Sequence, residues 1–221
     1  MLHPATLTFL TDLRANNNKA WLDANRPAYE AAKADFLALV TQVLSQLEAA
    51  DPAIADSQLQ PKKCVFRLNR DIRFSANKAP YKHNFGAWFN AGGKAAASAG
   101  YYLNLEPGGS FVAGGLYMPE AKTLATLRQE IDYNLPAFEA LLTTPDFRQH
   151  FPGLSREHSL QRPPKGYDAA NPALSYLKLK SFTASHPLPD ESLLRPEISQ
   201  QIVAGFGALQ PLVHFLNQAL D

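Results

Sequence analysis

A strict alternation of apolar and polar side chains in the middle of the chain is the feature that most constrains its fold. In "GYYLNLE", which begins at residue 100, Tyr101, Leu103 and Leu105 point to one side of an extended chain. The side chains between them are Tyr102, Asn104 and Glu106, which point to the other side. "PGG" and a second extended run, "SFVAGGLY", follow directly and predict a β-hairpin. Because one face is apolar and the other polar, we expect an antiparallel sheet that is covered on one side.

A long apolar stripe near the N-terminus predicts the element that covers this sheet. Apolar residues recur every three or four positions, as in one face of an amphipathic helix, from Tyr29 to Leu47. We expect the core side of this helix to consist of Phe36, Leu39, Val40, Val43 and Leu44. Similar patterns predict further helices near residues 7–13, 120–133 and 198–220, the last one interrupted near Pro211.

The order of these segments is helices, then strands, then helices with one late strand. Further strands are expected at Cys64–Leu68 and His83–Phe89, so that the sheet spans roughly residues 63–117, with a late strand near 178–186. This order favours an α+β fold over a wound β-α-β sheet. We therefore expect a single domain over residues 1–221, with an antiparallel or mixed sheet packed against helices from both ends of the chain.

The bulk composition excludes several classes of protein. The chain has 221 residues, a formal net charge of +1 and one cysteine, so no internal disulfide framework is available. No window approaches the roughly 20 apolar residues that span a bilayer, and the N-terminal segment lacks the pattern of a signal peptide. We expect a soluble, cytoplasmic protein with no membrane partner. The sequence indicates neither a cofactor nor an oligomeric state.

Positive charge is concentrated in one segment. Residues 61–82 contain seven Lys or Arg and one acid, whereas residues 1–60 contain four Lys or Arg and seven acids. A near-neutral chain with one basic segment is expected to bind an anion at one local surface rather than over its whole exterior. Arginine suits bidentate recognition of phosphate or carboxylate, and lysine adds a point charge.

The sequence therefore predicts an anion-binding cleft around Arg67–Lys82, with a phosphate-bearing small molecule or nucleotide as ligand. The candidate ligand-binding residues are Arg67, Arg70, Asp71, Arg73, Lys78, Tyr81, Lys82 and Lys165. We expect Asp71 to hold at least one arginine of this stretch, and Arg70 or Arg73 to present its guanidinium to a concave surface. Lys165 belongs to a second basic, proline-rich segment, Arg162–Lys180, which is expected to meet the first.

Three alternatives remain open. The basic stretch can be a purely structural ion-pair network, or it can dock nucleic acid or an acidic protein face, with nucleic acid ranked behind a small molecule. A hydrolase or transferase that uses Asp71 or Glu106 as general base, with Tyr81 nearby, is the third. No nucleophile elbow or phosphate loop occurs, since "GGK" at residues 92–94 is followed by Ala95, and the six histidines have no metal-ligand spacing. No catalytic residue or metal ligand is therefore assigned.

The basic stretch resembles the signature of a known family. "RLNRDIRFSANKAPYK" is similar to the pattern Arg-x-x-Arg-Asp-x-Arg-Phe, then Lys before Pro-Tyr-Lys, of the family named domain of unknown function 2461, or conserved hypothetical 02453. "GGLYMPEAKTLATLRQEI" and "PPKGYDAANPALSYLKLKSF" also look like segments of this mostly bacterial family. Asn77 and Leu22 depart from it, since Asp and an aromatic residue are common there. The resemblance implies a one-domain fold and a functional region at residues 67–82, but no reaction, because no activity is assigned to the family.

Overall fold

The structure, a computed structural model, describes residues 1–94 and 96–220. Within these residues the chain forms eleven helices and four strands. The helices are α1 (Pro4–Ala15), α2 (Lys19–Ala24), α3 (Arg26–Ala50), α4 (Pro52–Asp56), α5 (Pro61–Cys64), α6 (Ala121–Tyr133), α7 (Leu135–Leu141), α8 (Pro145–His150), α9 (Leu174–Leu177), α10 (Asp190–Leu193) and α11 (Ile198–Gln218). The strands are β1 (Phe85–Phe89), β2 (Gly100–Leu105), β3 (Phe111–Leu116) and β4 (Phe182–Pro187). None of the described helices is both long enough and apolar enough to cross a bilayer.

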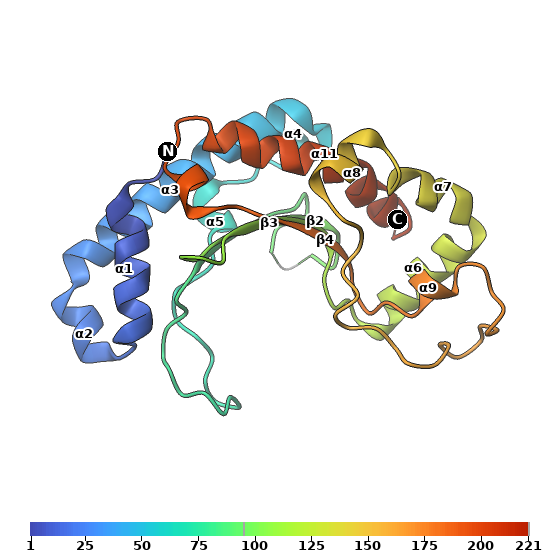
Figure 1. Cartoon of the computed structure of the whole chain (residues 1–221), viewed down its shortest axis with the longest axis horizontal. Coiled ribbons are helices and arrows are strands. Elements are labelled where there is room, and N and C mark those ends of the chain that lie inside the picture. The colour runs from blue at the N-terminus through green and yellow to red at the C-terminus, as the bar shows by residue number, and fades with distance from the viewer. Residues whose placement is uncertain (95, 221) are drawn as a thin grey trace.

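The four strands form one antiparallel sheet in the order β1-β2-β3-β4. Helices from both ends of the chain surround it, which confirms the predicted α+β fold (Figure 1). The long helices α3 and α11 lie side by side on one face of the sheet. Helices α1 and α2 stand at one end of the molecule, and α6 to α9, inserted between β3 and β4, form a lobe at the other.

The covered face of the sheet carries the apolar half of the alternation. Tyr101 and Leu103 are fully buried under α3 and α11, and the ring of Phe206 on α11 lies 5.2 Å from that of Tyr101 between centroids. On α3, the ring of Phe36 stacks at 5.4 Å on that of Phe85. The five predicted core residues of the long helix are all at most 2 % exposed, which confirms its apolar stripe: Phe36, Leu39, Val40, Val43 and Leu44.

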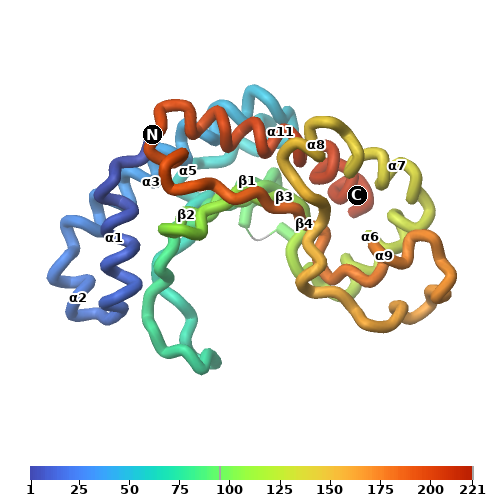
Figure 2. Tube along the Cα trace, viewed as in Figure 1, coloured from blue at the N-terminus to red at the C-terminus, as the bar shows by residue number. Residues whose placement is uncertain are grey.

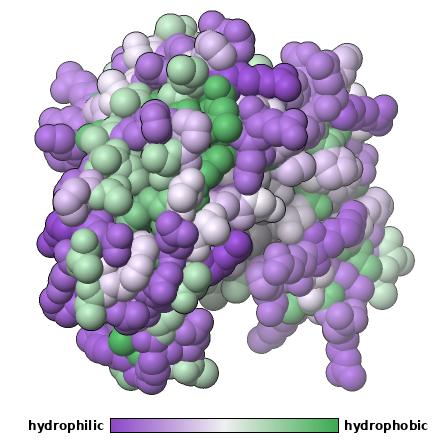
Figure 3. All heavy atoms as spheres, turned by 60° about the vertical axis from the view of Figure 1, so that its left-hand side comes forward, coloured by the Kyte–Doolittle hydropathy of each residue, from purple (hydrophilic) through white to green (hydrophobic). Residues whose placement is uncertain are grey.

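The opposite face of the sheet has no helix packed on it among the described elements (Figure 1). We call it the open face, and its residues are Gly86, Trp88, Tyr102, Asn104, Phe111, Ala113, Thr183, Ser185 and Pro187. Trp88, Tyr102 and Phe111 are partly exposed on it. In Figure 3 a hollow divides the lower half of the molecule, and most residues along its rim are hydrophilic. The alternation thus predicted correctly that helices cover only one side of the sheet.

Two expected elements take a different form. The strand expected at Cys64–Leu68 does not form, because α5 ends at Cys64 and only the isolated bridges Val65↔Ala87 and Asn69↔Tyr81 follow. Residues 65–70 pair first with β1 and then with residues 80–82, so this change of partner leaves no continuous ladder. The last helix is continuous from Ile198 to Gln218 despite Pro211, where an interruption was expected.

A buried carboxylate connects the N-terminal helices, the sheet and the last helix. Asp51 is 1 % exposed, and its Oδ2 accepts a 2.6 Å hydrogen bond from the Tyr101 hydroxyl. Its Oδ1 lies 3.1 Å from His214 Nε2 on α11 and accepts a 3.1 Å bond from the Ala53 amide at the start of α4. Burial alone would raise the pKa of Asp51. The bonds from Tyr101 and His214, with the charge of His214, outweigh burial and lower this pKa below 3.8.

The Asp51→Ala protein should be destabilised by about 2–4 kcal/mol at pH 7, because it loses a helix cap and leaves the Tyr101 hydroxyl buried without its acceptor. Since the pKa of Asp51 is lowered on folding, the ionised carboxylate stabilises the protein above about pH 4. This contribution is lost as the pH falls through the folded-state pKa. Urea unfolding of wild type and Asp51→Asn at pH 7 and pH 3 should show a smaller difference between them at pH 3. An equal difference at both pH values would contradict this assignment.

Candidate anion-binding site

The basic segment forms a projecting two-stranded arm. Residues 65–84, which we call the basic arm, leave the edge of the sheet beside β1 and turn back below it (Figures 1 and 2). Its two halves are joined by backbone hydrogen bonds of 2.9 Å from Lys82 N to Leu68 O and from Arg70 N to Pro80 O. A third bond, Phe66 N to Gly86 O, attaches the base of the arm to β1. The side chain of Asn17 bonds both backbone groups of Tyr81, which ties the arm to the turn between α1 and α2.

The positive groups at the tip of the arm, residues 71–79, are engaged within the arm itself. Arg73 Nη2 and Nε donate to the two carboxylate oxygens of Asp71 at 2.7 and 3.0 Å. Arg70 donates to the carbonyl of Ala79 at 3.2 Å and, at 3.4 Å, to the hydroxyl of Ser75. Lys78 Nζ donates to the carbonyl of Ile72 at 3.1 Å. Arg70 and Lys78 therefore close a tight loop that contains no regular secondary structure.

The tip confirms one part of the sequence interpretation and corrects another. Asp71 does hold an arginine, as predicted, through a bidentate pair. The guanidinium groups of Arg70 and Arg73 are not left free for a ligand as expected, because Arg70 bonds its own loop and Arg73 is paired with Asp71 and lies exposed beside Phe74. The hydrogen bonds from Arg73 lower the pKa of Asp71, which makes this carboxylate a weaker base. The general-base role considered for Asp71 is thus unfavourable.

Arg70→Ala should loosen the tip without unfolding the protein. Its guanidinium joins the two sides of the loop, so its removal should increase amide hydrogen exchange across residues 71–79 while the melting temperature stays the same. Arg73→Ala is the matched control: its ion pair is exposed to solvent, so exchange should change much less. Equal exchange in both variants would show that Arg70 does not close the loop.

The base of the arm differs, because its cations gather around one aromatic ring. Lys82 Nζ lies over the ring of Phe66, 5.3 Å from its centroid, and Lys94 Nζ lies over the same ring at 5.2 Å. Lys94 comes from the loop after β1 and donates a 2.7 Å hydrogen bond to the carbonyl of Val65. Arg67, next in the chain to Phe66, is exposed. We call Phe66, Arg67, Lys82 and Lys94 the Phe66 cluster.

No carboxylate of the described residues forms an ion pair with this cluster. Among the described residues, the ion pairs of Lys, Arg and His involve neither Lys82, Lys94 nor Arg67. Partial burial lowers the pKa of Lys82, and the charges of Arg67 and Lys94 lower it further. All three side chains thus bring like charge to one place, an arrangement that a bound anion would stabilise.

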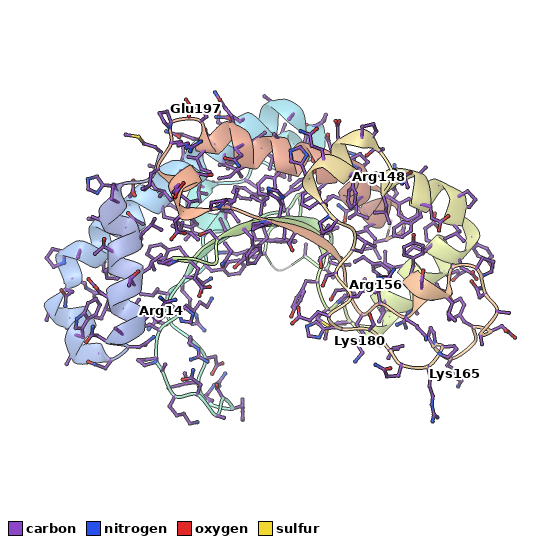
Figure 4. All side chains as sticks on the ribbon, viewed as in Figure 1. Arg14, Arg148, Arg156, Lys165, Lys180 and Glu197 are labelled. Carbon is purple, nitrogen blue, oxygen red and sulfur yellow. The ribbon has the colours of Figure 1, made fainter. Side chains whose placement is uncertain are left out.

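The candidate residues of the sequence separate into three places. Arg67 and Lys82 lie in the Phe66 cluster, whereas Arg70, Asp71, Arg73 and Lys78 build the tip. Tyr81 is 7 % exposed and packs in the core. Figure 4 shows Lys165 and Lys180 on the lobe of α6 to α9, across the molecule from the arm. The structure therefore does not bring the second basic segment against the first.

Sequence reasoning missed two members of the cluster. Lys94 was considered only within "GGK", which fails as a phosphate loop, and its approach to the arm depends on the path of a loop between two strands. Phe66 lies within the strand that was expected at Cys64–Leu68 and was given no functional role. Instead it is partly exposed, with its ring 6.2 Å from that of Tyr102 on the open face. The alternation of β2 had already placed Tyr102 on this face, and it was the only signal available.

The surroundings of three other kinds of reactive group, a general base, metal ligands and a thiol, show what chemistry they could support. Glu106 accepts a 2.9 Å hydrogen bond from His83 Nε2 beside the open face. Of the two carboxylates considered as a general base, Asp71 is paired with an arginine and Glu106 with an imidazole. No group of three or more His, Cys, Asp or Glu side chains that could hold a metal ion occurs within residues 1–94 and 96–220. Cys64 is 1 % exposed, and burial raises the pKa of its thiol to about 11.

Cys64 should therefore be inert in the folded protein. At pH 8 a buried thiol with a pKa of about 11 contains almost no thiolate, so a disulfide reagent should modify it only after unfolding in urea. The chain has one cysteine, so the absorbance of the released thiolate counts this site alone. Rapid modification of the native protein, at a rate near that of free glutathione, would contradict the buried placement.

The fold and the Phe66 cluster together define an α+β protein with a one-sided antiparallel sheet, whose open face is bordered by a basic arm. The sequence profile of the family described as conserved hypothetical protein (DUF2461) matches residues 5–215, and the chain belongs to this family. No curated protein and no solved structure matches the chain.

Proposed function

We propose that the protein binds a phosphate-bearing ligand at the Phe66 cluster. The observation that carries the proposal is the pair of ammonium groups, Lys82 and Lys94, that share one aromatic ring without a carboxylate partner among the described residues. A phosphate group placed between them would accept charge-assisted hydrogen bonds from both and would receive the charge of Arg67. The ligand site of the sequence analysis thereby moves from the tip of the arm to its base.

The organisation of the arm supports this location. Cations at the tip are already bonded to backbone carbonyls and to Asp71, so an anion there would have to break existing contacts. At the base, Lys82 Nζ donates no hydrogen bond to any described residue. Its stem can stay packed beside Phe66 while the ammonium group meets the ligand. An anion bound there would offset the mutual repulsion of the three cations Arg67, Lys82 and Lys94.

Isothermal titration with pyrophosphate in low salt tests the proposal. Lys82→Met and Lys94→Met should each weaken binding roughly tenfold, because each removes one charge-assisted contact but keeps an unbranched apolar stem. The double variant should not bind, and added salt should weaken binding to the wild type. Binding should also weaken as the pH rises through the pKa of Lys82, which lies below 10.5.

Two control variants separate this site from the rest of the basic surface. Arg73→Ala at the tip and Lys165→Met on the distant lobe should bind pyrophosphate like the wild type, and the Lys165 variant also tests whether the second basic segment takes part. Thermal melts should show that all four single variants fold. No measurable affinity in the wild type, or wild-type affinity in the Lys82→Met/Lys94→Met protein, would refute the proposal.

A further inference from the structure

A row of aromatic rings leads from the Phe66 cluster across the open face. The ring of Tyr102 lies 6.2 Å from that of Phe66, and the ring of Phe111 lies 5.8 Å beyond Tyr102, between centroids. The three rings come from the arm, β2 and β3, and each is partly exposed. Trp88 is the cross-strand neighbour of Tyr102 on the same face. No described helix covers these rings, and each keeps a partly exposed aromatic surface that a planar ligand group could meet.

The row ends at a shallow cavity of about 340 Å³. Phe111, Ser185 and Pro187 line it from the open face, and Gly108 and Asp190 close its outer side. The Asp190 carboxylate accepts two 3.0 Å hydrogen bonds from the amide of Gly108, which fixes the β2–β3 turn against the start of α10. The end of the open face away from the lysines is therefore apolar and carries a carboxylate.

This distribution of charge limits the length of the ligand. A single strand of nucleic acid has a phosphate at each nucleotide and needs cations along its path. Here the cations lie at one end of the aromatic row, Asp190 lies at the cavity at the other end, and the Glu106 carboxylate is paired with His83. A short ligand with its phosphate at one end and a flat ring at the other matches this arrangement.

We infer that the ligand is a mononucleotide, whose phosphate binds the Phe66 cluster and whose base stacks on the row of Tyr102 and Phe111. The inference rests on the proposed phosphate site and names the class of ligand that the site takes. Base–aromatic stacking is tolerant of base identity, because every base has a π-face, so modest discrimination among bases is expected. The phosphate sets the position of the ligand and the rings add affinity.

Comparison of adenosine monophosphate with ribose 5-phosphate tests the inference. Adenosine monophosphate should bind roughly tenfold more tightly, because only it carries a base to stack. Tyr102→Leu and Phe111→Leu should remove most of this advantage and leave the affinity for ribose 5-phosphate unchanged. Lys82→Met should weaken both ligands by the same factor. Phe74→Leu is the matched control, because Phe74 is an aromatic side chain of the arm that is 94 % exposed and lies away from the row, at the tip.

A fluorescence measurement keeps the test independent of how the leucine variants fold. In a Trp21→Phe background Trp88 is the one remaining tryptophan of the chain. Adenosine monophosphate should quench its emission, and ribose 5-phosphate should not.

Three outcomes would overturn the inference, and they differ in whether they also refute the proposed phosphate site. Equal affinity for the two ligands, without quenching, refutes base stacking but leaves the phosphate site intact. No binding of pyrophosphate or of either ligand refutes both proposals. Far tighter binding of a ten-residue oligothymidylate than of thymidine monophosphate refutes the mononucleotide in favour of a single strand.

Discussion

The one-sided burial of the sheet is the constraint on which the rest of the structure depends. Side chains such as Tyr101, Leu103 and Val112 all point to one face, and both long helices, α3 and α11, pack there. Burial of a large apolar side chain contributes about 1.5–3 kcal/mol, so a face with many of them must be covered. The other face is bordered by the arm before β1 and by the lobe between β3 and β4. The position of the candidate site follows from this division.

Much of the architecture could be predicted because it follows from the spacing of apolar residues within single helices and strands. The two-residue period of β2 and the stripe of α3 each report the burial of a whole element, and hydrophobic burial is the largest favourable contribution to folding. The Asp51 network could not be predicted in this way. Its partners Tyr101 and His214 are 50 and 163 positions away in the chain, and no local pattern marks a buried carboxylate that depends on both. The strand expected at Cys64–Leu68 failed for the same kind of reason, since regular pairing depends on neighbours elsewhere in the chain.

The candidate site was located in the correct segment but at the wrong end of it. Composition identifies charge and cannot tell which charges are already bonded. Arg70 and Lys78 bond backbone carbonyls that only the folded tip brings near. Lys82 has no such partner within residues 1–94 and 96–220, and Lys94 reaches the arm from the loop after β1. Phe66 belongs to the expected strand Cys64–Leu68, yet its ring contacts two ammonium groups because the arm lies outside the helical layer.

A structural role explains the tip of the arm better than it explains the base. At the tip Arg70 and Lys78 bond carbonyls across the loop and Arg73 is paired with Asp71, so each cation has a defined structural contact. At the base, Lys94 has one such contact, with the carbonyl of Val65, but the ammonium of Lys82 has none among the described residues. An apolar side chain would lose the attraction between the ammonium and the Phe66 ring, but it would avoid desolvation and the repulsion from Arg67 and Lys94. A partly buried lysine with no carboxylate partner in the described part of the chain, beside two other cations, is thus a cost to the free protein, and a bound phosphate is the simplest group that would offset it.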